Sequence, residues 1–161
     1  MPLTFSPVSY EARPMPVGHD HRAACRALLH DLGVMGHVAA MGLSTIEGKR
    51  PDVISIDTLG NLIAWEVKTR FLASERQSAW RKYATSADML IMVYPATVDL
   101  TAWHRPGWLP PDPTSRDCGA LLWSSPRWWL PHVPRLLNPI PRHRDFLTQQ
   151  LRPIIGPQPA P

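Results

Sequence analysis

Residues 52–69 read DVISIDTLGNLIAWEVKT, two apolar runs on either side of a short polar turn. Residues 52–57 and 62–69 are rich in the β-branched and aromatic side chains that strands favour. Between them, residues 58–61 supply a glycine and an asparagine, both of which are frequent in turns. The sequence therefore predicts a β-hairpin over residues 52–69.

The hairpin carries Asp52, Glu66 and Lys68. Side chains alternate across a strand, so Glu66 and Lys68 point to one face, while Val67 points to the other and its carbonyl lies between them. Asp52 joins that face only if its cross-strand partner is residue 66 or 68. This requires a turn of odd length, such as residues 59–61. A two-residue turn at 60–61 would instead place Asp52 opposite residue 69 and separate the three groups.

If the register holds, two carboxylates and an ammonium group converge on an otherwise apolar face. A divalent cation relieves the repulsion between the carboxylates, and Mg²⁺ prefers such oxygen ligands. Asp52, Glu66 and the backbone carbonyl of Val67 are the expected ligands for Mg²⁺ or Mn²⁺. Lys68 orients the attacking water, helps to deprotonate it or stabilises charge in the transition state, and these roles stay open. The alternative is an exposed Glu66–Lys68 pair beside a strand that merely begins with Asp52.

Periodicity predicts further elements around the hairpin. A helix is expected over residues 19–32 with Gly33 as its stop, a first strand over 34–41 and a second helix over 74–87. The apolar run 89–94 predicts a buried strand that ends at Pro95. This order predicts an α/β fold with a central mixed sheet flanked by helices.

The remaining chain is rich in proline and tryptophan. We expect residues 1–18 to form a flexible arm and residues 19–152 a single domain, with a core at 19–97 and a C-terminal lobe at 98–152. The lobe is expected to hold a hairpin around 119–123 and 128–130 and a helix near 142–151. Residues 153–161 are expected to be a disordered tail.

Composition narrows the classes of function. The chain has 161 residues with 44% hydrophobic residues, which suits one globular domain. Its two cysteines lie far apart, so the sequence supports neither a zinc finger nor a disulfide framework. We expect a cytoplasmic location, because no signal peptide and no apolar segment of about 20 residues is apparent. The net charge of +4 permits an anionic partner. Motifs of serine hydrolases, P-loop proteins and dinucleotide-binding proteins are absent.

Pro51-Asp52 followed by Glu66-Val67-Lys68 resembles the active-site motif of the PD-(D/E)XK nuclease superfamily. Flanking motifs resemble more closely the MmcB-like family of bacterial DNA repair proteins: Cys25-Arg26-Ala27-Leu28 before Leu32-Gly33, Lys49-Arg50, Thr69, Trp80 with Tyr83, and Asp117-Cys118-Gly119-Ala120-Leu121. The resemblance covers about residues 19–150. It implies a restriction-endonuclease-like core in the order α-β-β-β-α-β, and a Mg²⁺-dependent endonuclease acting in DNA repair or recombination.

The resemblance also implies one further acidic residue in the first strand or helix. Residues 34–43 contain none, and Glu47, His21 and Asp31 stay open as supporting residues. Basic and polar residues near the motif are expected to contact the phosphates of DNA: Lys49, Arg50, Thr69, Arg70, Arg76, Arg81 and Lys82.

Two other functions stay open. One is a DNA-binding accessory module that keeps the fold but cleaves weakly or not at all. The other is a protein-interaction domain that uses the tryptophan-rich lobe, with a protein partner or a second copy of the chain. For Trp103, Trp108, Trp123, Trp128 and Trp129 we favour packing over base stacking. Trp80 and Tyr83, three residues apart on the predicted helix, are likewise expected in the core.

Overall fold

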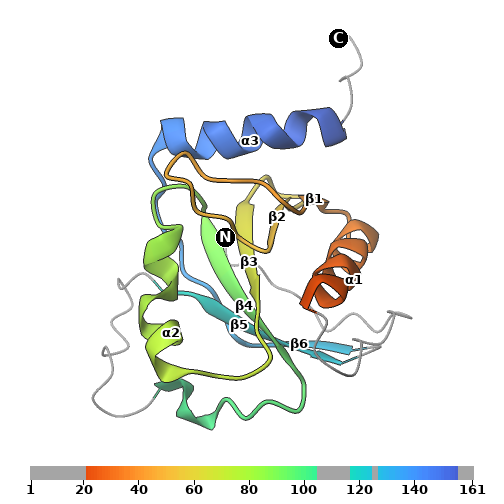
Figure 1. The fold of residues 1–161 in the computed structure, drawn as a ribbon, viewed down its shortest axis with the longest axis vertical. Coiled ribbons are helices and arrows are strands. Elements are labelled where there is room, and N and C mark those ends of the chain that lie inside the picture. Colours follow the sequence, from red (N-terminus) through yellow and green to blue (C-terminus); the bar gives the residue numbers. More distant parts are fainter. Residues whose placement is uncertain (1–20, 105–116, 125–126, 156–161) are drawn as a thin grey trace.

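The computed structural model describes residues 21–104, 117–124 and 127–155, and a six-stranded mixed sheet forms its centre (Figure 1). The strands lie in the sheet in the order in which they follow along the chain. The pairs β1–β2, β2–β3 and β5–β6 are antiparallel, whereas β3–β4 and β4–β5 are parallel. The strands are β1 (Val38–Ala40), β2 (Val53–Ile56), β3 (Leu62–Val67), β4 (Met89–Pro95), β5 (Gly119–Ser124) and β6 (Arg127–His132).

Helices cover both faces of this sheet. They are α1 (His21–Val34), α2 (Ala73–Ser78) and α3 (Pro141–Ile155), with short 3₁₀ segments η1 (Ala79–Lys82) and η2 (Thr101–His104). Figure 1 shows α1 and α2 on opposite sides, with α3 lying across one end of the sheet. No helix in the described part of the chain is long and apolar enough to cross a membrane. The fold is thus α/β, as the sequence predicted.

The alternation of β3 divides the core in two. Leu62 and Ala64 pack with residues of η1, β4 and α3 on one face. Ile63 and Trp65 pack with α1, β4 and β5 on the other face. All six residues of β3 are buried. A strand that is buried on both faces tolerates a charged residue only where that residue has partners, which makes Glu66 the exceptional residue of this strand.

The register of the predicted hairpin pairs Val53 with Trp65, and extended by one residue it places Asp52, just before β2, opposite Glu66. Ile56 pairs with Leu62, so five residues, 57–61, connect the strands and the turn has the odd length that the site requires. The carboxylate of Asp57 accepts hydrogen bonds from the backbone N–H groups of Leu59 and Asn61, at 2.9 and 2.8 Å. A backbone bond between residues 57 and 61 leaves 58–60 at the tip, one residue earlier than the 59–61 turn given as an example.

Several predicted boundaries need correction at the N-terminal end. The first helix ends at Val34 rather than at Leu32, and Gly36, with φ of +88°, makes the turn that follows. Glycine adopts this left-handed conformation without the clash that a Cβ atom would cause. The first strand is therefore only Val38–Ala40 instead of residues 34–41.

The second helix is shorter than the predicted 74–87. Regular α-helix stops at Ser78, and the 3₁₀ segment η1 leads into a turn. Tyr83 and Ala87, which lie beyond the end of the helix, are both buried in the core cluster on one face of the sheet. The predicted helical pattern therefore continues past the point at which the regular α-helix ends.

The C-terminal hairpin is confirmed as β5 and β6. The last helix continues through Ile155, so residues 153–155, predicted as part of a disordered tail, are helical. Burial of Leu147 and Leu151 anchors this helix on the sheet. The arm at 1–18 and the end of the tail lie outside the described residues.

Asp88 joins the last helix to the hairpin. Its Oδ2 accepts the N–H of Leu62 at 2.7 Å and an Nη2–H bond from Arg144 at 2.9 Å. Arg144 Nε donates to the same carboxylate at 3.1 Å, and its Nη2 also donates to the carbonyl of Gly60 at 2.8 Å. One charged pair thus holds α3, β3 and the hairpin turn together.

We predict that Asp88→Ala lowers the free energy of unfolding by about 2–3 kcal/mol, because the substitution removes charge-assisted hydrogen bonds and leaves the Leu62 N–H unpaired. Urea denaturation followed by circular dichroism measures the effect. Asp145→Ala removes an exposed carboxylate from α3, the helix that carries Arg144. This variant is the control and should change stability by less than about 0.5 kcal/mol. Equal losses in the two variants would contradict a specific role for Asp88.

Candidate functional site

Asp52 reaches across the end of the hairpin to β3. Its Oδ2 accepts the backbone N–H of Val67 at 2.8 Å. In an antiparallel ladder the N–H and C=O of one residue face the same neighbouring strand, so the Val67 carbonyl faces the side on which Asp52 lies. The aspartate and the backbone of Val67 are therefore brought together, as the hairpin register requires.

Glu66 lies beside them and is 8% exposed. Burial raises the pKa of its carboxyl group above the usual value; a hydrogen bond from the Tyr83 hydroxyl opposes this rise, and the negative charge of Asp52 adds to it. Lys68 Nζ lies 3.6 Å from Glu66 Oε2 and also favours the ionised form. Two acidic groups thus share a poorly hydrated corner with one ammonium group.

A small pocket opens beside Glu66 and Lys68. Glu75, from the first turn of α2, and Lys82, from η1, also line it, together with Ser78, Ala79 and Met92. Glu75 Oε1 lies 4.0 Å from Lys68 Nζ. Glu75 was not expected from the sequence as a site residue. Its position seven residues after Lys68, in the first turn of the next helix, was the available signal.

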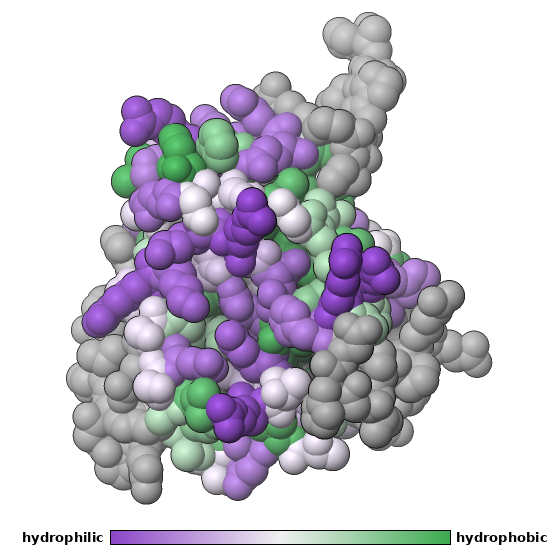
Figure 2. All heavy atoms as spheres, in the orientation of Figure 1, coloured by the Kyte–Doolittle hydropathy of each residue, from purple (hydrophilic) through white to green (hydrophobic). Residues whose placement is uncertain are grey.

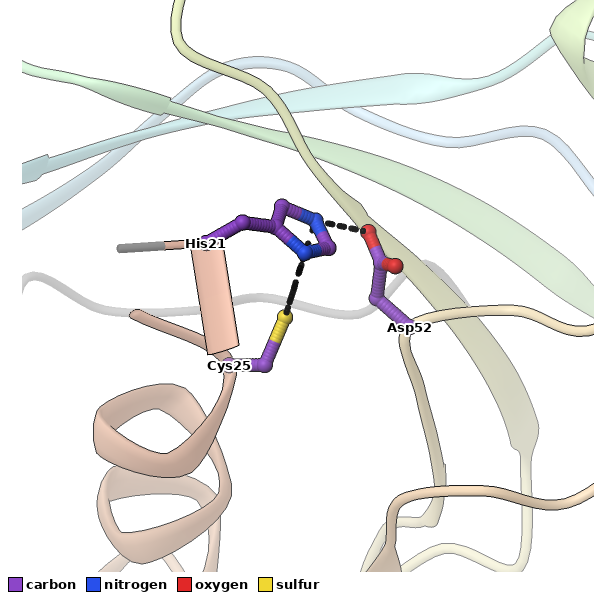
Figure 3. A group of neighbouring side chains, drawn as sticks. All are labelled: His21, Cys25 and Asp52. Atoms are coloured by element: carbon purple, nitrogen blue, oxygen red, sulfur yellow. Dashed lines mark hydrogen bonds and ion pairs between the residues drawn. The ribbon is translucent and has the colours of Figure 1, made fainter. Parts of the chain in front are cut away.

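Two side chains of α1 complete the other side of Asp52. His21 Nε2 lies 3.1 Å from Asp52 Oδ2, and Cys25 Sγ lies 3.8 Å from the same ring nitrogen. Figure 3 shows the His21 ring between the sulfur and the carboxylate. Burial raises the pKa of the Cys25 thiol to about 12, and the charges of Asp52 and Glu66 add to the effect. Cys25 was not among the residues expected at the site.

Asp31 and Glu47, the other two supporting candidates, lie in different surroundings. Glu47 accepts a hydrogen bond from Thr85 at 2.9 Å and lies 3.5 Å from the ring of His143 on α3. Asp31 is fully buried. Burial raises its pKa to about 6, and nearby His30 and the indole of Trp123 offset part of the rise. Of the three candidates, the structure brings only His21 to Asp52.

The expected DNA-contacting residues divide into two groups. Lys82 lines the pocket, and Lys49, Arg50, Thr69, Arg70 and Arg81 are exposed. Arg76 is 3% exposed; its Nη2 donates to Asp117 at 2.6 Å, and its guanidinium lies 5.1 Å from the centre of the Trp103 ring. The expected phosphate contact by Arg76 is therefore wrong in this structure, because its charge is already paired inside the protein.

The favoured packing role of the tryptophans holds for three of them. Trp103, Trp123 and Trp128 are buried, whereas Trp129 is 42% exposed and Trp108 lies outside the described residues. Trp80 is half-buried against the core. On the face drawn in Figure 2, hydrophilic side chains predominate among the coloured atoms and apolar ones are scattered between them.

We predict that Tyr83→Phe raises the pKa of Glu66 further, because the hydroxyl that favours the carboxylate is removed. The carboxylate would then form only at a higher pH than in the wild type. Titration of the side-chain carboxyl carbon by NMR measures the shift. Tyr94→Phe, which removes a buried hydroxyl that has no hydrogen-bond partner, is the control. An unchanged Glu66 titration in Tyr83→Phe would show that the hydroxyl does not act on this carboxylate.

We predict that Asp31→Asn stabilises the protein at pH 7 by up to about 3 kcal/mol. Asp31 titrates near 3.8 when unfolded and near 6 when folded, so folding above pH 6 must bury a charge. The wild type gains stability as the pH falls from 6 towards 4, and the advantage of the variant should shrink over that range. Chemical denaturation across pH 4–8 measures the difference. A gain that is independent of pH would contradict the assignment.

Comparisons with known proteins give the fold and no function. No family model matches the chain, and no curated protein matches it. The solved structure of a protein of unknown function from Silicibacter pomeroyi matches with a TM-score of 0.55 and 15% identity, over 88% of this chain and 84% of that chain. At this identity the match shows a shared fold. The chain therefore has an α/β fold, built on a mixed six-stranded sheet with helices, that a solved protein shares.

Proposed function

We propose that the protein is a metal-dependent DNA nuclease of the PD-(D/E)XK type. One observation carries the proposal: the hairpin register sets Asp52 opposite Glu66, and Lys68 follows directly at the end of the same strand. These are the residues of the motif, and their common place at one end of the hairpin supports the proposal. The order helix, three strands, helix, strand over residues 21–95 agrees with a restriction-endonuclease-like core.

The donor atoms fit Mg²⁺ or Mn²⁺. Asp52 and Glu66 offer carboxylate oxygens, and the Val67 carbonyl faces the Asp52 side. Mg²⁺ keeps several waters and needs few protein ligands, so two carboxylates and one carbonyl suffice. When bound, the cation supplies Lewis acidity that polarises a phosphate and lowers the pKa of a coordinated water. Burial raises the pKa of Glu66, and a cation bound beside it would favour the ionised carboxylate.

The remaining side chains of the pocket suit a phosphodiester. Lys68 and Lys82 present two ammonium groups beside Glu66, where they would attract the scissile phosphate and stabilise charge that develops on it. Tyr83 holds Glu66 in place through its hydroxyl. The exposed residues Lys49, Arg50 and Arg70 would contact flanking phosphates, which gives binding that weakens as salt is raised. We also propose that the nuclease acts in DNA repair or recombination.

A DNA-binding accessory module with little or no cleavage is the second candidate. The observation that favours it is the occupation of both carboxylates, Glu66 by Tyr83 and Lys68, and Asp52 by Val67 and His21. Within the described ranges, no group of three acidic side chains shares metal-binding distance. The burial of Trp103, Trp123 and Trp128 weighs against a protein-interaction surface built on the tryptophans.

One experiment distinguishes the nuclease from the DNA-binding accessory module. Supercoiled and branched DNA are incubated with the protein and Mg²⁺ or Mn²⁺, beside Asp52→Ala and Lys68→Ala. We predict cleavage by the wild type and a rate at least about 100-fold lower in both variants, because each loses a group that stabilises charge in the transition state. Asp145→Asn, on the exposed side of α3, is the matched control and should retain the wild-type rate.

Each result decides between the candidates. Cleavage that disappears in both variants supports the nuclease. Binding at low salt without cleavage, unchanged by Lys68→Ala, supports the accessory module. If DNA does not bind even at low salt, both candidates are wrong, because phosphate contacts are strongest under that condition.

A further inference from the structure

The side of Asp52 that faces α1 holds donors of a different chemical kind. His21 and Cys25 stand one turn apart on α1, and Asp52 comes from the segment just before β2 (Figure 3). One potential ligand atom from each of these three residues lies within 4.8 Å of the other two. Within residues 21–104, 117–124 and 127–155, this is the group of histidine, cysteine and acidic side chains that has metal-binding spacing.

The separations suit a tetrahedral ion. Zinc bonds of about 2.1 Å to nitrogen and oxygen and about 2.3 Å to sulfur, at tetrahedral angles, put neighbouring ligand atoms about 3.4–3.6 Å apart. Here His21 Nε2 lies 3.1 Å from Asp52 Oδ2 and 3.8 Å from Cys25 Sγ. The third separation, between Asp52 and Cys25, is at most 4.8 Å, and the His21 side chain, which is 53% exposed, has room to adjust.

The donor set selects among metals. Thiolate and imidazole bind Zn²⁺ and related transition metals, whereas Mg²⁺ prefers oxygen ligands alone. The N–H of Val67 fixes the orientation of the Asp52 carboxylate at 2.8 Å, as hydrogen bonds around metal sites commonly do. We propose that His21, Cys25 and Asp52 bind a zinc ion, with its fourth position open to water or to another ligand.

Binding has a defined proton balance. The Cys25 thiol loses its proton to solvent, and the thiolate sulfur bonds to the ion. Cys25 is 2% exposed and Asp52 is partly buried, so both ligands are shielded from bulk water. Three protein ligands and one open position are also the arrangement that catalytic zinc sites use.

The zinc site goes beyond the proposed nuclease and shares only Asp52 with it. Glu66 and Lys68 are not among the zinc ligands. Zinc binding can therefore be tested separately from DNA cleavage. If both are correct, zinc would withdraw Asp52 from the Mg²⁺ site, since one carboxylate must then serve two ions.

Cobalt is the probe, because Co²⁺ replaces Zn²⁺ and is coloured. The full chain, stripped of metal, is titrated with Co²⁺ and then with Zn²⁺. We predict a thiolate-to-cobalt absorption band in the near ultraviolet, with visible bands of tetrahedral intensity that Zn²⁺ abolishes. Cys25→Ser should remove the near-ultraviolet band. It should also weaken Zn²⁺ binding at least about 100-fold. Loss of a residue that only hydrogen-bonds to a metal ligand weakens binding by up to about 100-fold, and loss of a ligand itself should cost at least as much.

Two further variants test whether a loss of binding comes from misfolding or from removal of a histidine that is not a ligand. His21→Ala removes an exposed side chain, leaves the core intact and should also weaken Zn²⁺ binding. His30→Ala, an exposed histidine of the same helix, should bind as the wild type does. Absence of the thiolate band in the wild type, or its survival in Cys25→Ser, overturns the proposal. Glu66→Gln should abolish DNA cleavage and leave the cobalt spectrum unchanged, so failure of the nuclease and failure of the zinc site are distinguished.

Discussion

The register between β2 and β3 is the constraint on which the rest of the structure depends. Side chains alternate with a period of two, so a slip of one residue would exchange the two faces of the strand. Ile63 and Trp65 would then leave the α1 side of the core, and Asp52 would no longer oppose Glu66. Asp57 secures the turn by accepting two backbone N–H groups within it. One short turn therefore orders both the hydrophobic core and the acidic corner, which Asp52 and Glu66 form.

The acidic corner is costly for the fold, and the structure offsets the cost only in part. Glu66 lies at the end of a strand that is buried on both faces, where an ionised carboxylate is poorly solvated. The Tyr83 hydroxyl and the Lys68 ammonium group supply two partners. Asp52 adds a second negative charge nearby. The region thus combines oxygen donors on the Glu66 side with nitrogen and sulfur donors on the α1 side, and the two proposed metal sites rest on these groups.

Some of the basic residues have structural roles, which changes the meaning of the net charge. Arg76 is buried between Asp117 and Trp103, and Arg144 pairs with Asp88 to join α3 to the hairpin. Neither guanidinium is free for a phosphate. The net charge of +4 therefore does not indicate which basic residues could contact DNA. The proposal rests instead on the accessible basic residues near the pocket, above all on Lys82.

The hairpin and the common face of Glu66 and Lys68 follow from the sequence alone, because strand alternation is a local property. Whether Asp52 joins that face did not. The register needed one tertiary fact, the choice among possible turns. The approach of His21 to Asp52, 31 residues away, and the hydroxyl of Tyr83 on Glu66 were decided only by the packing of α1 and η1 on opposite faces of the sheet. So were the burial of Arg76 and the place of Glu75 in the pocket. Contacts between elements depend on how whole faces fit together, and periodicity within one element carries no information about that fit.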